Sequence, residues 1–179
     1  MEDVTSVWLR LRHISIGVGI AFSVRLLFSA VPPEPSGLGM ASLAAGVEVI
    51  AALVLGYPAA IAVGLGAIPW GDPALALAAV PGALGGAAGL LMSLFLFRRF
   101  LGARRVEGVR YGMGAVIGFS ALHALTTGLA TLLFTLAAGT VPGLAAVLVA
   151  LAANFAGAMA LIVGLYIATS VALRLLRAL

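Results

Sequence analysis

The sequence contains no cysteine, no lysine and no glutamine, and Asn154 is its only asparagine. Without cysteine the chain has no disulfide, no thiolate metal ligand and no thiol nucleophile. Charged side chains make up 9% of the 179 residues and hydrophobic ones 63%, with a mean hydropathy of +1.22. Soluble domains carry about 25% charged residues, so this composition predicts an integral membrane protein.

Every basic side chain except histidine is arginine, and five of the ten arginines lie in segment 98–110, between two long apolar runs. The pI near 10.7 is compatible with nucleic-acid binding, but the arginines cluster at the ends of apolar segments. Arginine-rich short loops stay on the cytoplasmic side during insertion, and they attract anionic lipid. We therefore predict that segment 98–110 is cytoplasmic and that the partner is the lipid bilayer, with no nucleic-acid partner.

The apolar region 38–68 is too long for one upright crossing, because about 20 residues span the hydrocarbon core. If it crossed only once, segment 98–110 would lie outside, against the positive-inside rule. We therefore split it at Gly56-Tyr57-Pro58 into two passes. The second pass, Ala59–Ile68, is short and is either a tilted half-span or a re-entrant hairpin.

The predicted fold is all-α: a polytopic membrane helical bundle of about six segments, with both termini cytoplasmic. Residues 1–179 form one integral membrane domain, expected to be multi-pass in the cell membrane. The predicted outer loops are 32–37, 69–73 and 138–143. Small residues recur at helix-packing spacing, most convincingly between Gly82 and Gly89, where they let helix backbones approach closely in lipid.

Three ionisable residues lie within predicted spans, where a charge costs at least ~2.5 kcal/mol: Arg25, Glu48 and His123. Arg25 and Glu48 lie at similar depths below the first outer loop, so the two side chains can pair. That pair either fixes helix packing or belongs to a substrate cavity. His123 shares a helix face with Ser120 and Thr127, and it either bonds a buried neighbour or serves as a ligand contact or proton relay.

Polar residues in and below the outer loops complete the candidate ligand site. Trp70 offers a stacking face, and acidic side chains suit a cationic or hydrogen-bonding ligand. Asn154 lies ten to twelve residues below the outer turn 138–143, at a depth that suits either helix packing or the same cavity. The predicted ligand-binding residues are Glu34, Glu48, Trp70, Asp72, His123, Asn154 and Arg25.

Enzymatic readings lack the necessary side chains, so we predict no catalytic activity and no cofactor. Gly118-Phe119-Ser120-Ala121 resembles the serine motif of intramembrane rhomboid proteases, whose catalytic histidine comes from a later helix, but no histidine follows His123. Haem between helices needs two histidines at facing depths, and His13 lies at the membrane edge. The acidic and histidine residues show no metal-binding spacing.

The run from Val47 to Gly66, followed by Ala83–Phe97 and Arg98-Arg99, resembles the substrate-binding S-component of energy-coupling-factor transporters. The resemblance covers about a third of the chain. It implies six helices and a vitamin-type or micronutrient-type ligand near the outer side. It also implies docking, through Gly17 and Ala21, on a transmembrane coupling subunit driven by two ATPases.

The leading prediction is therefore a membrane transport subunit that binds a small molecule for ATP-driven uptake with partner subunits. The alternative is a non-catalytic structural, accessory or sensory membrane subunit without a ligand cavity. The sensory version reflects a second resemblance, to the bacterial MASE1 membrane domain, which rests on Pro35-Ser36-Gly37.

Overall fold

The computed structural model describes residues 4–29, 40–100, 113–139, 141 and 143–178. Within these ranges every regular element is an α-helix, as predicted. The six helices are α1 (Val4–Ser29), α2 (Met40–Leu55), α3 (Ala59–Gly66), α4 (Pro73–Phe100), α5 (Met113–Ala137) and α6 (Leu144–Ala178). Glu34, which was predicted to line the ligand site, lies outside the described residues.

In the part of the chain that the structure describes, four helices are long and apolar enough to cross a membrane: α1, α4, α5 and α6. The protein is thus a helical, membrane-embedded chain, as its composition predicts. The apolar region 38–68 is split, and α2 and α3 have only 16 and 8 residues. At 1.5 Å per residue these helices are about 24 and 12 Å long, less than the ~30 Å hydrocarbon core.

The break between α2 and α3 lies at the predicted turn. Gly56 has φ +69, the left-handed conformation in which glycine carries no steric penalty, and its N–H is bonded to the carbonyl of Ala52 at 2.9 Å. The guanidinium of Arg98, near the end of α4, lies 4.4 Å from the centre of the Tyr57 ring. This cation–π contact fastens the end of α4 to the turn.

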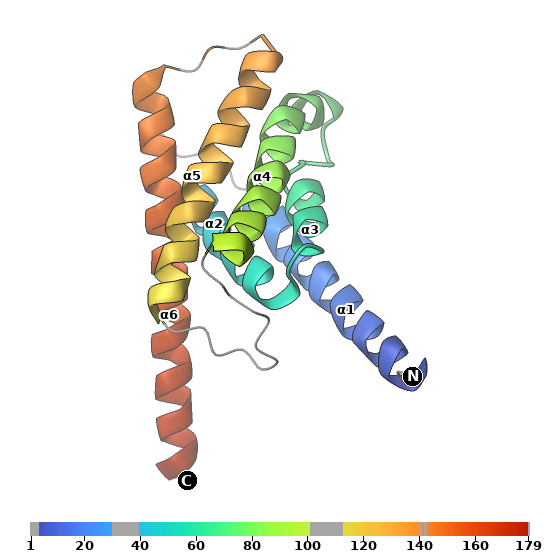
Figure 1. Cartoon of the computed structure of the whole chain (residues 1–179), viewed down its shortest axis with the longest axis vertical. Coiled ribbons are helices and arrows are strands. Elements are labelled where there is room, and N and C mark those ends of the chain that lie inside the picture. Colours follow the sequence, from blue (N-terminus) through green and yellow to red (C-terminus); the bar gives the residue numbers. More distant parts are fainter. Residues whose placement is uncertain (1–3, 30–39, 101–112, 140, 142, 179) are drawn as a thin grey trace.

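Helix α2 is the centre of the bundle, because it contacts each of the other five helices. The others form an open arc around it in the order α1, α3, α4, α5, α6, with each packed on the next. Within the described residues α1 and α6, the two ends of the arc, do not touch. Figure 1 shows the two chain ends at the lower end of the view and the α5–α6 connection at the upper end.

The most extensive contact is between α4 and α5, and glycines make it possible. A Cβ atom at Gly85 would lie 2.5 Å from the Cα of Thr131, and one at Gly89 would lie 2.3 Å from the Cα of Thr127. Such distances are far below van der Waals contact, so only glycine allows this approach. The Gly85/Gly89 pair within the predicted Gly82–Gly89 stretch is thus a helix contact, whereas Gly82 has nothing within 4 Å.

Candidate functional site

Side chains from three helices meet in the core of the bundle and form one chain of polar contacts. Arg25 of α1 donates from Nε to Oε1 of Glu48 on α2, at 2.9 Å. The other carboxylate oxygen, Oε2, lies 3.0 Å from Nε2 of His123 on α5. The second ring nitrogen of His123, Nδ1, lies 3.3 Å from the hydroxyl of Thr127, one turn further along α5. We call these four side chains the polar chain.

The polar chain is buried most deeply at His123. The side chain of His123 is 1% exposed, that of Glu48 7% and that of Arg25 19%. The link between Arg25 and Glu48 was one of the sequence-based predictions, and it is an ion pair. Arg25 is therefore the member that approaches the surface, whereas His123 is enclosed by the bundle.

Glycine and aromatic packing hold the ends of the polar chain in place. A Cβ at Gly66 would lie 2.9 Å from the Cβ of Arg25, so α3 ends directly against the arginine stem. The ring of Phe119 stacks on His123, with centroids 6.3 Å apart and planes at 11°. Phe97 of α4 packs edge-on against Phe119, with centroids 5.1 Å apart.

The position of His123 also depends on the contact between α4 and α5. The hydroxyl of Thr126 donates across the interface to the carbonyl oxygen of Gly89 at 2.9 Å. Thr127, its neighbour, lies against the same glycine. Together these contacts fix the turn of α5 that carries His123 and Thr127, because α5 cannot slide along α4 without breaking them.

The residues predicted in the outer loop 69–73 lie outside the polar chain and have local roles. Trp70 is exposed and donates its indole N–H to the carbonyl oxygen of Leu65 at 3.0 Å. Asp72 caps α4, because Oδ1 accepts the backbone N–H groups of Ala74 at 2.8 Å and Leu75 at 3.3 Å. Pro73 follows as the first helical residue, the usual position for proline after a cap.

The other predicted residues lie on α6 and α1. Asn154 is half-buried on α6 and is not a member of the polar chain. Gly17 packs against α2, since a Cβ there would meet Cδ2 of Leu55 at 2.5 Å. Ala21 is buried. Gly17 and Ala21 both also line a groove between α1 and α6.

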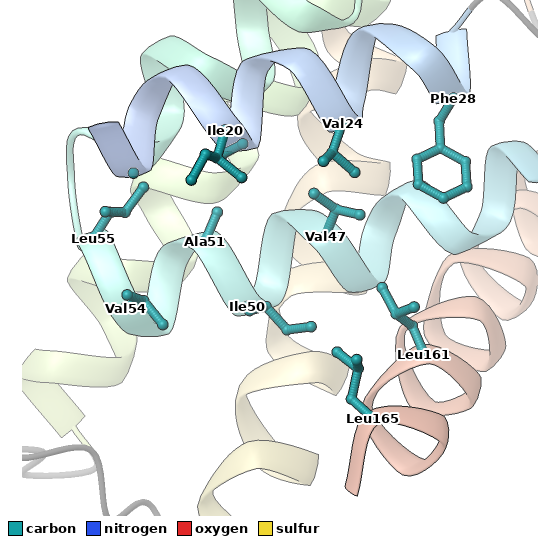
Figure 2. Close-up of a pocket in the computed structure, with 12 residues that line it drawn as sticks. Ile20, Val24, Phe28, Val47, Ile50, Ala51, Val54, Leu55, Leu161 and Leu165 are labelled. Atoms are coloured by element: carbon teal, nitrogen blue, oxygen red, sulfur yellow. The ribbon is translucent and has the colours of Figure 1, made fainter. Parts of the chain in front are cut away.

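This groove occupies the opening of the helical arc and has a volume of about 430 Å³. Figure 2 shows α2 as its floor, with α1 on one side and α6 on the other. Its lining is apolar, from Ile20 and Val24 through Ile50 to Leu161 and Leu165. Two further grooves, between α3 and α4 and between α5 and α6, are also apolar, and none of the three is lined by Arg25, Glu48 or His123.

Sequence reasoning found the ionisable members of the polar chain but missed several of their supports. Thr127 was recognised as sharing a face with His123, whereas Thr126, Phe119 and Gly66 were not predicted to support the polar chain. A threonine three residues after a histidine, on a helix that packs against a Gly-x-x-x-Gly helix, is a usable signal for such a contact. Among the described residues no group of three or more histidine or acidic side chains is placed to hold a metal ion.

Comparison with known proteins identified no relative. No family model matches the chain, and no curated protein or solved structure matches it significantly.

Proposed function

We propose that the protein is a multi-pass subunit of the cell membrane that binds a small molecule and takes part in its uptake together with partner subunits. The observation that carries the proposal is the convergence of Arg25, Glu48 and His123, from three helices, on the central helix α2. Ionisable groups at membrane depth are costly, and in transport proteins they mark substrate and ion pathways. The resemblance to S-components of energy-coupling-factor transporters supports the same class.

The ligand site is centred on the ion pair of the polar chain. Arg25 and Glu48 neutralise each other, which lowers the cost of their burial. A polar ligand that exchanges for one partner of this pair gains charge-assisted hydrogen bonds from the other. Trp70 and Asp72, together with Glu34, are assigned to the approach from the outer side, and Asn154 is assigned to the contribution of α6 to the same ligand site.

The groove between α1 and α6 is the proposed contact for a transmembrane coupling subunit driven by ATPases. The resemblance assigns that contact to Gly17 and Ala21, and both residues lie on the wall of this groove. Small residues and an apolar lining suit a transmembrane helix, because close backbone approach drives association in lipid.

The test is to isolate the full chain from membranes in mild detergent and to analyse it by native mass spectrometry. We expect a retained small molecule or co-isolated coupling subunit and ATPases, with the small molecule lost from the Glu48→Gln variant. Gly82→Ala is the matched control, because nothing lies within 4 Å of that position. A folded protein that elutes alone and empty, in both wild-type and variant forms, contradicts the proposal.

The second candidate is an accessory or structural membrane subunit, and a specific observation favours it. The four side chains of the polar chain satisfy one another, as expected of residues that fix helix packing. In that case the Arg25→Met and Glu48→Met double variant keeps its partners in the isolation experiment. Loss of the small molecule with retained folding in the same variant supports the transport subunit instead.

A further inference from the structure

We infer that the groove between α3 and α4 binds one phospholipid with an anionic headgroup, with an acyl chain in the groove and the phosphate on the guanidinium of Arg98. The inference goes beyond the proposed function, because neither the polar chain nor the groove between α1 and α6 takes part in it. It rests on the apolar lining of the groove and on the cation at one end of it.

The groove lies where the short helix α3 packs beside α4 (Figure 1), and it has a volume of about 320 Å³. Its lining residues are apolar, within 60–68 on one wall and within 80–87 on the other. Ile61 and Leu84, one on each wall, are 61% and 49% exposed, so the groove opens toward the surface of the bundle. A lipid chain beside the bundle therefore enters it from the side.

The length of the groove matches one leaflet of the bilayer. Helix α3 is about 12 Å long, and the groove continues only to Ile68, two residues after its end. Half of the ~30 Å hydrocarbon core measures about 15 Å. A transmembrane helix of a partner would therefore meet this groove over only half of its own length, whereas an acyl chain from a single leaflet matches it.

The cation at one end of the groove is Arg98. Tyr57 directly precedes the wall formed by α3, and its carbonyl oxygen accepts the N–H of Ala60 at 3.1 Å. Arg98 follows Ala87 by 11 residues, or three turns on the same face of α4, and the half-exposed Leu91 continues the apolar surface between them. The guanidinium carbon lies 4.4 Å from the centre of the Tyr57 ring. The arginine and the ring thus form the end of the groove at the α2–α3 turn.

Arg98 is held in place on two sides, and its charge calls for an anion. A Cβ at Gly56 would lie 2.8 Å from Nη2, so the glycine leaves room for the guanidinium against the turn. The ring of Tyr57 offers no oxygen to the N–H donors. The two acidic residues in the described part of the chain, Glu48 and Asp72, are engaged elsewhere. A phosphate, which accepts two parallel hydrogen bonds from arginine, supplies the missing negative charge.

A phospholipid presents its groups in the same order as the groove and the arginine. The acyl chain gains little on leaving the bilayer, because lipid tails are as apolar as the groove, so the groove serves to position it. The preference for an anionic headgroup comes from Arg98, and the exposed Arg99 beside it adds a second positive charge. The predicted orientation places both arginines at the cytoplasmic leaflet, whose surface is anionic.

The experiment is native mass spectrometry of the full chain, exchanged into non-ionic detergent and titrated with dioleoylphosphatidylglycerol or with dioleoylphosphatidylcholine. We expect one phosphatidylglycerol to bind first, with phosphatidylcholine about fivefold weaker, the effect of one arginine near an anionic lipid. Arg98→Gln should weaken the first phosphatidylglycerol about tenfold, because charge-assisted hydrogen bonds to the phosphate are lost.

Two matched controls separate the site from net charge and from general packing. Arg99→Gln removes the same charge from the next residue, which does not lie over the Tyr57 ring, and it should change the affinity much less. Ala87→Leu fills the groove and should weaken binding, whereas Ala88→Leu makes the same change at a neighbouring position outside the lining and should not.

Equal losses in Arg98→Gln and Arg99→Gln overturn the inference, because they would reflect net charge alone. Unchanged affinity in a folded Ala87→Leu variant overturns it too, as does displacement of the lipid by an equal concentration of inorganic phosphate. A dimer that forms in place of the lipid complex and disappears in Ala87→Leu would assign the groove to a second copy of the chain instead. Both arginines are exposed, so their variants keep the fold and answer the question whatever the alanine variants do.

Discussion

At the scale of single residues, Glu48 has the most demanding position in the bundle. It lies at the middle of the central helix and serves two partners, Arg25 and His123, one with each carboxylate oxygen. The pairing with Arg25 was predictable from depth alone, since the two residues lie on consecutive segments below the same loop. The pairing with His123 joins positions 75 residues apart and depends on how α5 packs against α2, which the sequence pattern does not encode.

Replacing Glu48 by glutamine should therefore destabilise the protein. The amide keeps the shape and a hydrogen bond to His123, but it leaves Arg25 without its counter-charge. We expect a loss of about 2–3 kcal/mol, below the 3–5 kcal/mol typical of fully buried pairs because Arg25 is partly exposed. Unfolding by denaturing detergent in mixed micelles measures it. An unchanged midpoint would show that the ion pair contributes nothing to folding.

Substitutions of Asp72 distinguish a structural role of this residue from a role in ligand binding. Because Asp72 caps α4, its replacement by alanine should lower the stability of the protein by about 1 kcal/mol. Replacement by asparagine should lower it much less, because asparagine caps equally well. Thermal unfolding in detergent provides the measurement for both variants. If asparagine is as damaging as alanine, the capping explanation fails and the negative charge itself is needed.

At the scale of helices, the contact of α4 with α5 shows how much the spacing of small residues reveals. The Gly85/Gly89 pair was recognisable in the sequence, yet the overlapping pair Gly82/Gly86 looks the same there. Only the packed helices distinguish them, because Gly85 and Gly89 face threonine backbones whereas Gly82 faces open space. Spacing predicts that a helix has a close-packing face, but the choice of face depends on the neighbouring helix.

Alanine substitutions test this distinction directly. Gly89→Ala places a methyl group 2.3 Å from the Cα of Thr127, so α4 and α5 must separate, at a cost of about 1–3 kcal/mol or more. Gly82→Ala meets nothing and should gain up to about 1 kcal/mol from helix propensity. Denaturation of the two variants side by side gives the answer. Equal effects would mean that the close approach of the two helices is not maintained in the membrane.

At the scale of the whole molecule, the arrangement around α2 explains what the sequence could and could not predict. Hydropathy and the arginine-rich segment predicted the helical class and the break at Gly56. Helix α6, with 35 residues or about 52 Å, is longer than the ~30 Å hydrocarbon core is thick. The open arc, with its gap between α1 and α6, was not predicted, because helix order in space is set by pairwise packing that periodicity does not report.

The absence of cysteine makes the proposed orientation easy to measure. Single cysteines at Gly71 and Val141 should react with a membrane-impermeant maleimide in intact cells, because both belong to predicted outer loops. A cysteine at Gly102, in the arginine-rich segment, should react only after permeabilisation. Labelling of Gly102 in intact cells would refute the orientation, whatever the protein does.

The glycines between α4 and α5 have a mechanical consequence. Where α4 and α5 touch through their backbones, no side-chain rotamers lie between them to rearrange. The two helices therefore move as one rigid unit. Helix α1 is the opposite case: 6% of its membrane-length window is buried, and Arg25 links it to the central helix through the ion pair with Glu48. Helix α1 is therefore the helix that moves most readily. When the bundle is deformed, we expect α1 to tilt first.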